Sequence, residues 1–122
     1  MKRFILIIFA LFLISLQAFA GSQKSTMEKI MNSWLGENLE TVIKKWGYPT
    51  RTQSIADHKL YYWDKKEYYC DSYSCGEHSC NRIFEIDNSN IIIDWQWEGN
   101  WCPKTHKSAK KWLNPQNDPW LK

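Results

Sequence analysis

Residues 91–98 read Ile-Ile-Ile-Asp-Trp-Gln-Trp-Glu, and this stretch carries the clearest β pattern in the chain. Successive side chains of an extended strand point to opposite faces of a sheet. The alternation predicts an apolar face formed by Ile91, Ile93, Trp95 and Trp97, and a wetter face formed by Ile92, Asp94, Gln96 and Glu98. We therefore expect an antiparallel sheet with one solvated face and one face that another layer covers.

Further strands are expected upstream. Residues 80–86 form a second clear strand, and the turn cluster at residues 88–90 joins it to the last strand. Residues 59–63 are rich in aromatic side chains and form another strand, with residues 51–56 as its partner. The sequence therefore predicts an antiparallel meander of three or four strands.

The covering layer is expected from two short amphipathic helices, residues 25–36 and 38–47. Apolar residues spaced i, i+3, i+4 and i+7 form one stripe along a helix. These are Met27, Ile30, Met31 and Trp34 in the first helix, and Leu39, Val42, Ile43 and Trp46 in the second. Gly36 and Gly47 can end the two helices. The predicted fold class is α+β. In this prediction, two N-terminal helices pack on a three- to four-stranded antiparallel β-meander, and disulfide bonds cross-link the domain.

The first twenty residues have the anatomy of a secretory signal peptide. Lys2 and Arg3 make a basic start, residues 4–16 are almost entirely apolar, and residues 18–20 are a small-x-small cleavage signal. The apolar run is shorter than the about 20 residues of a transmembrane helix. We expect cleavage after Ala20. The chain then divides into a signal peptide (1–20), an α+β domain (21–102) and a basic tail with Pro and Trp (103–122).

The charge of the chain is unevenly distributed. Its formal value of +3 falls to +1 once the leader is removed; residues 21–102 are mildly acidic, and residues 103–122 carry five Lys against Asp118. A nucleic-acid binder normally has a much stronger basic excess, so that function is not expected. We expect a largely solvated tail, with at least one of Trp112 and Trp120 docked. Its charge permits contact with an anionic membrane or an acidic partner, without a lipid anchor.

Four cysteines follow the leader. An even number in an exported chain indicates disulfides, because the compartment is oxidising. The alternative is a zinc site formed by Cys70, Cys75, His78 and Cys80. Structural zinc sites usually use more closely spaced Cys pairs, so we expect two disulfides.

The residues alone leave the disulfide connectivity open. Strict pairing of the last two strands, with Ile86 opposite Ile91, would place Cys75 opposite Cys102. That register would leave Cys70 and Cys80 to form the second bridge.

Catalytic residues are not evident in the sequence. A Ser or Cys nucleophile needs a base close by. The histidines His58, His78 and His106 lie in expected loops or in the tail, without a nucleophile motif. The carboxylates Glu85, Asp87, Asp94 and Glu98 fall on strand faces or at a turn, where solvated acids are ordinary. The sequence has no phosphate loop and no H-E-x-x-H motif, so we expect a non-enzyme with no cofactor and no metal.

Several short motifs taken together resemble a known family. They are Trp34-Leu35-Gly36, Val42, Trp-Gly-Tyr-Pro at 46–49, Tyr61-Tyr62-Trp63, and residues 80–84, 91–97 and 99–102. A helix pair with a Gly turn, a Gly-x-Pro after the second helix and a Tyr-rich strand are similar to the BamE-like (SmpA/OmlA) family of small bacterial cell-envelope proteins. The resemblance covers residues 27–102 and implies a two-helix, three-strand fold that binds other envelope components. Family members are usually lipoproteins with a Cys after the signal peptide, so Gly21 implies a non-lipidated variant.

The resemblance also bears on the disulfides. In similar proteins with only two cysteines, these stand at the positions of Cys80 and Cys102. That implies a Cys80–Cys102 bridge and leaves Cys70–Cys75 as a small loop. We favour this pairing because Gly99-Asn100 can bend the strand end out of strict register.

Aromatic side chains are the main functional clue. Six rings crowd into thirteen residues, at Tyr61, Tyr62, Trp63, Tyr68, Tyr69 and Tyr73. A domain of this size cannot bury both faces of such a strand, so some rings should be exposed, and exposed aromatic residues often anchor partners. The candidate binding residues are Tyr61, Tyr62, Trp63, Tyr68, Tyr69 and Trp112.

These observations favour an exported, non-catalytic binding protein of the bacterial cell envelope, periplasmic or secreted. Its expected partner is another envelope protein or an envelope polymer, engaged through the aromatic surface. The alternative is a secreted inhibitor or effector that acts on an external protein target, because a compact stapled scaffold resists proteolysis.

Overall fold

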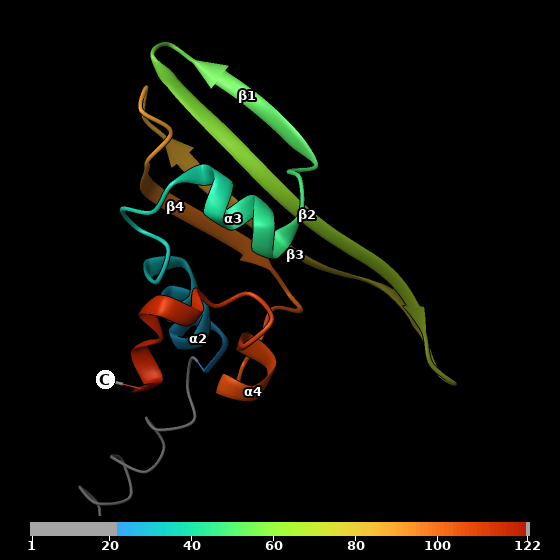
Figure 1. Ribbon diagram of the computed structural model, residues 1–122. Coiled ribbons are helices and arrows are strands. Elements are labelled where there is room, and N and C mark those ends of the chain that lie inside the picture. The colour runs from blue at the N-terminus through green and yellow to red at the C-terminus, as the bar shows by residue number, and fades with distance from the viewer. Residues whose placement is uncertain (1–21, 122) are drawn as a thin grey trace, which may run out of the picture.

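The computed structural model describes residues 22–121, so the expected signal peptide lies outside the described residues. Two helices come first, α2 (Ser22–Asn32) and α3 (Leu39–Trp46). Four antiparallel strands follow in the order in which they pair: β1 (Arg51–Ile55), β2 (His58–Cys70), β3 (Cys75–Ile86) and β4 (Ile92–Gly99). The short helices α4 (His106–Ala109), η1 (Pro115–Asn117) and η2 (Pro119–Leu121) complete the described part, which is α+β with a four-stranded meander (Figure 1). Within these residues, no helix is long and apolar enough to cross a membrane.

Local sequence explains where α3 begins and ends. The Asn38 side chain accepts a hydrogen bond from the Glu40 N–H and caps the first turn. Gly47 follows the last turn with φ of 84°, a left-handed conformation that glycine adopts without a Cβ clash. Its N–H donates to the Ile43 carbonyl, which closes the helix as the sequence predicts.

The turn between the two helices is hydrogen bonded to the beginning of β4. The Gly36 N–H donates to the Ile92 carbonyl, and the Ile92 N–H donates to the Glu37 carbonyl. The Leu39 N–H donates to the Asn90 carbonyl in the turn before the strand. These bonds hold the turn between the helices at the start of β4. The first helix begins at Ser22 rather than at the expected residue 25.

A β-bulge at the start of β4 corrects the predicted face pattern. Glu85 pairs with Asp94 and Ile86 pairs with Ile92, so Ile93 is an extra residue on β4. One extra residue turns the preceding side chains to the opposite face. Ile92 is therefore buried in the core, whereas Ile93 is exposed. The expectation that Ile93 belongs to the apolar face was wrong, while Trp95 and Trp97 do pack against the core.

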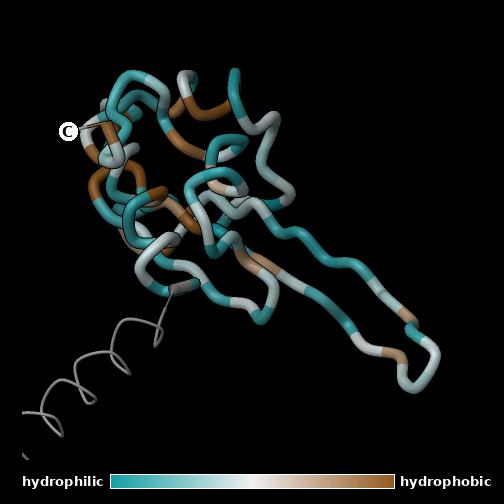
Figure 2. The backbone as a smooth tube through the Cα atoms, turned by 90° about the horizontal axis from the view of Figure 1, so that it is seen from below, coloured by the Kyte–Doolittle hydropathy of each residue, from teal (hydrophilic) through white to brown (hydrophobic). Residues whose placement is uncertain are grey.

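The hydrophobic core draws on the helices, the sheet and the C-terminal segment together. Trp46 of α3 stacks on Phe84 of β3, with ring centroids 5.3 Å apart. The indole N–H groups of Trp34 and Trp46 both donate to the backbone carbonyl of Trp112, each at 2.8 Å. This carbonyl therefore joins the two helices to a segment far along the chain. Most of the strongly hydrophobic residues lie in this body of the molecule (Figure 2).

The segment after Cys102 packs more fully than the sequence suggested. Ala109, Trp112 and Leu113 are buried, at the i, i+3 and i+4 spacing of one helical face. Trp120 is half-buried and stacks on His106, with ring centroids 4.7 Å apart. The expected docking of a tail tryptophan is therefore present, but the segment is part of the core and not a largely solvated tail.

The disulfides are Cys70–Cys75 and Cys80–Cys102. The pairing that the family resemblance implied is confirmed, and the alternative with Cys75 bonded to Cys102 is wrong. The reason is the register: Cys80 pairs with Gly99, so the chain beyond Gly99 is already close to it. With all four thiols bonded to each other, the alternative zinc site lacks its thiolate ligands. Two disulfides indicate an oxidising, extracytoplasmic compartment.

Candidate functional site

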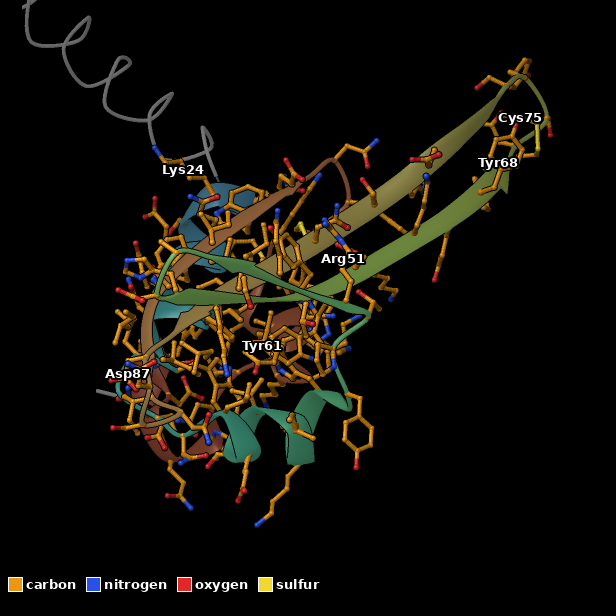
Figure 3. All side chains as sticks on the ribbon, turned by 90° about the horizontal axis from the view of Figure 1, so that it is seen from above. Lys24, Arg51, Tyr61, Tyr68, Cys75 and Asp87 are labelled. Carbon is orange, nitrogen blue, oxygen red and sulfur yellow. A yellow bond between two sulfur atoms is a disulfide. The ribbon has the colours of Figure 1, made fainter. Side chains whose placement is uncertain are left out.

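Strands β2 and β3 extend well beyond their neighbours in the sheet. β1 pairs with β2 only as far as Tyr62, and β4 pairs with β3 only as far as Cys80. Within the described chain, residues 66–79 therefore form a two-stranded hairpin whose strands pair only with each other, and we call it the arm. It projects from the body as a long ribbon, with Tyr68 and Cys75 near its far end (Figure 3). At about 3.4 Å per residue, it reaches on the order of 20 Å beyond the sheet.

Covalent and polar contacts hold the far end of the arm. Cys70 and Cys75 are opposite each other in the register, and their disulfide closes the hairpin. Within the turn, Oδ1 of Asp71 accepts hydrogen bonds from the N–H groups of Tyr73 and Ser74, at 2.8 and 2.7 Å. These two donors hold the pKa of the Asp71 carboxyl below its ordinary value.

The base of the arm is braced by the chain that leaves β4. Oδ1 of Asn100 accepts from the Ser79 N–H at 2.9 Å, and its Nδ2 donates to the Glu77 carbonyl at 3.0 Å. The Trp101 N–H donates to the Ser79 carbonyl at 3.0 Å. An isolated two-stranded hairpin is marginally stable in water. Contacts at both ends therefore explain how this one keeps its shape.

The arm carries exposed aromatic rings. Tyr68 is 74% exposed, Tyr69 is 56% exposed and Tyr73, in the turn, is 97% exposed. On one face of the arm, Tyr69 stacks on His78, with ring centroids 5.6 Å apart. His78 in turn contacts Trp101, with centroids 4.6 Å apart, and Trp101 is half-exposed. Tyr68, next to Tyr69 on β2, points to the opposite face of the arm. We call these five side chains together the aromatic surface of the arm.

Charged side chains on the arm pair with one another. Lys66 on β2 lies 3.3 Å from Glu77 on β3, and both are exposed. At the base of the arm, Lys65 lies 3.8 Å from Glu67. Exposed pairs of this kind contribute about 0–1 kcal/mol to stability. They do not cover the rings, which remain the main apolar feature of the arm.

The structure separates the six predicted binding residues. Tyr68 and Tyr69 lie exposed on the arm, whereas Tyr61 is half-buried against the core. Tyr62 is buried beneath the Arg51 guanidinium, 3.7 Å from its ring centroid, and donates its hydroxyl to Gln53. Trp63 and Trp112 are buried in the core.

Those last two positions correct the predicted surface. Trp63 faces the helices because alternate residues of β2 face that side, and its indole N–H donates to the Gly47 carbonyl at 3.0 Å. Trp112 follows α4 in a turn, where its N–H donates to the Ala109 carbonyl, and its ring is buried in the core. Neither ring is part of the exposed aromatic residues of the arm.

Sequence reasoning missed three members of the surface. Tyr73 was noted among the crowded rings but not assigned to the site, and His78 was expected to be solvated. Trp101 received no role at all. The spacing Cys70-x4-Cys75 is the signal that would have found the arm, since it fits two strands joined by a four-residue turn.

The other histidines have ordinary contacts. His58 pairs with Glu85, and His106 lies 3.1 Å from Asp118 and stacks on Trp120. Within residues 22–121, no group of three or more His, Cys, Asp or Glu side chains is placed to hold a metal ion.

Comparisons with protein-family models, with curated proteins and with solved structures found no match to this chain. The resemblance to the BamE-like family therefore stays a prediction, and the geometry of the arm carries the functional inference.

Proposed function

We propose that this chain is an exported, non-catalytic binding protein of the bacterial cell envelope that engages a partner through the aromatic surface of the arm. The single observation that carries this proposal is the exposure of Tyr68, Tyr69 and Tyr73 on a stapled hairpin outside the core. Because these rings are exposed, they do not stabilise the fold by packing in its core. Tyr and Trp are the residues that most often dominate binding energy at interfaces.

Rigidity supports the same conclusion. A binding loop that is ordered before contact loses less conformational entropy when it binds. The Cys70–Cys75 disulfide and the Asn100 side chain order the two ends of the arm. Among the described residues, the outer edge of β2 in the arm pairs with no other strand, and such an edge offers backbone groups to a partner strand. We infer that the partner is a protein, with an envelope polymer as the second possibility.

The place of action follows from the leader and the disulfides. We propose a periplasmic or secreted protein without a lipid anchor, because Gly21 follows the expected cleavage site. Membership of the BamE-like family in its non-lipidated form belongs to the same proposal. In this arrangement the two N-terminal helices pack on the sheet and leave the arm free.

The projecting shape of the arm also favours the alternative function. A stapled loop that stands out from a scaffold is suited to entering a cleft of a target, as a secreted inhibitor or effector would do. The location of the native protein separates the two functions. Retention in the periplasm favours the envelope role, and release into the medium favours the inhibitor or effector.

Affinity capture from envelope extract tests the proposal. The mature chain is compared with a triple variant in which Tyr68, Tyr69 and Tyr73 are changed to Ala. Tyr48→Ala is the matched control, because Tyr48 is 85% exposed and lies outside the arm. We expect a partner that the wild type and the Tyr48 variant retain and the triple variant loses. Equal capture by the triple variant would remove the arm from the proposed function.

A further inference from the structure

A pocket of about 350 Å³ opens at the foot of the arm, next to the C-terminal segment. Its lining includes the aromatic residues Trp101 and Trp112 and the lysines Lys65, Lys104 and Lys111. No acidic side chain is among the described residues that line it. This volume lies within the range of about 300–1,000 Å³ that small-molecule sites occupy.

Three distant parts of the chain bring the lysines to this place. Lys65 lies on β2, directly opposite Cys80 in the register. The Cys80–Cys102 disulfide holds the chain next to Lys104 against the same part of the sheet. Lys111 lies in the turn after α4, next to the buried Trp112. A covalent bond and core packing therefore hold the backbone at these lysines.

A further cation contacts the ring of Trp112, which lines the pocket. The Arg82 side chain is buried between two rings, with its guanidinium carbon 3.8 Å from the Trp112 centroid and 4.4 Å from the Trp46 centroid. Among the described residues, Nε and Nη1 of Arg82 have no hydrogen-bond partner. Burial lowers the pKa of Arg82 to about 10, so it remains charged at neutral pH.

Acidic residues balance these charges only in part. Glu67 lies 3.8 Å from Lys65 and also attracts the Lys111 ammonium, and Asp64 attracts the Arg82 guanidinium. Burial, followed by repulsion from Lys65, lowers the pKa of the Lys111 ammonium. Like charges held this close are stabilised by an anion placed between them.

We propose that this pocket binds the phosphate group of a small anionic ligand, or of a lipid headgroup, between Lys65, Lys104 and Lys111. The lysine ammonium binds phosphate as a point charge. Unlike the planar guanidinium of arginine, it does not require a fixed two-pronged geometry, so several lysines can share one phosphate. The half-exposed ring of Trp101 offers an apolar surface to the remainder of the ligand. This site adjoins the aromatic surface of the arm, and Trp101 belongs to both.

Titration with inorganic phosphate at constant ionic strength tests the site on the intact, oxidised chain. Nuclear magnetic resonance follows the indole and backbone N–H signals of Trp101, Trp112 and Lys111. We expect saturable shifts at these residues, and at least tenfold weaker binding in the double variant Lys65→Met and Lys111→Met. The double variant Lys44→Met and Lys45→Met is the charge-matched control, because both lysines are exposed on α3 and neither lines the pocket. Shifts without saturation, or equal affinity in the Lys65/Lys111 variant, would overturn the proposal.

Two further measurements complete the test. Phosphate should raise the midpoint of thermal unfolding of the wild type but not that of the Lys65/Lys111 variant, because a ligand of the folded state stabilises it. Vesicles of phosphatidylglycerol, with phosphatidylcholine vesicles as the control, identify the source of the phosphate. Lysine-dependent binding to the anionic vesicles points to a headgroup, and binding of soluble phosphate alone points to a free ligand. Absence of both kinds of binding would contradict the site.

Discussion

The phenol ring of Tyr69 stacks on the imidazole ring of His78, with an interplanar angle of 21°. The two residues are diagonal neighbours and not register partners, because Tyr69 is opposite Gly76 and His78 is opposite Glu67. Glycine has no side chain, so nothing opposite Tyr69 competes for the space into which its ring leans. The two strands of the arm thereby present one continuous row of rings, which Trp101 extends.

His78→Ala removes the middle ring of this row. We expect partner binding to weaken about tenfold, because the rings on both sides lose their support. The free energy of unfolding should change by less than about 1 kcal/mol, since His78 lies outside the core. Urea unfolding and affinity capture measure the two effects, with the exposed His58→Ala as control. Unchanged capture would show that the row of rings does not form the partner surface.

Trp112→Ala tests the role of the C-terminal segment. We expect a loss of about 3–5 kcal/mol in the free energy of unfolding, because a buried indole is replaced by a cavity. Trp101→Ala is the control and should cost less than about 1 kcal/mol, because Trp101 is half-exposed. Chemical unfolding followed by circular dichroism measures both. Similar losses in the two variants would contradict the placement of Trp112 in the core.

The two disulfides should contribute differently to stability. Cys80 and Cys102 are separated by 22 positions, and in the chain-entropy model closing that loop contributes about 3 kcal/mol. Cys70 and Cys75 are separated by 5 positions, for which the same model gives about 2 kcal/mol. Paired Cys→Ser variants and urea unfolding measure the difference. Amide hydrogen exchange should accelerate mainly in the arm of the Cys70/Cys75 variant, and throughout the body of the other one. The reverse order of stabilities would contradict this assignment.

Acid should loosen the turn of the arm. The Tyr73 and Ser74 N–H groups lower the pKa of the Asp71 carboxyl below its ordinary 3.8 in the folded state. The contribution of this carboxylate is therefore fully present above about pH 4, and it is lost as the pH falls through the lowered pKa. Nuclear magnetic resonance of the Tyr73 and Ser74 amides during an acid titration measures the change. Asp71→Ala should abolish the titration, and amide signals that titrate equally in this variant would exclude Asp71 as the cause.

Much of the body could be predicted from the sequence, because burial leaves a periodic pattern. The helical stripes that end in Trp34 and Trp46 and the apolar alternation of the last strand are of this kind. The bulge at Ile93 could not be predicted in this way, since three consecutive isoleucines fit either face equally well. The burial of residues 103–121 was not predicted, because Pro115, Pro119 and several lysines interrupt a short apolar pattern.

The arm was missed for a physical reason. Neither of its faces is buried, so hydrophobic alternation does not mark its strands, and residues 64–67 read Asp-Lys-Lys-Glu. Disulfide and backbone bonds hold it instead. Consequently, the sequence identified Tyr68 and Tyr69 as candidates but placed the buried Trp63 and Trp112 beside them.

Photocrosslinking in living cells tests the central claim most directly. A benzophenone derivative of phenylalanine replaces Tyr73 on the arm in one variant and Tyr48 on the body in another, and both positions are exposed. We expect one discrete crosslinked product at position 73 and none at position 48. No product at position 73, or the same products at both positions, would contradict a partner-binding role for the arm.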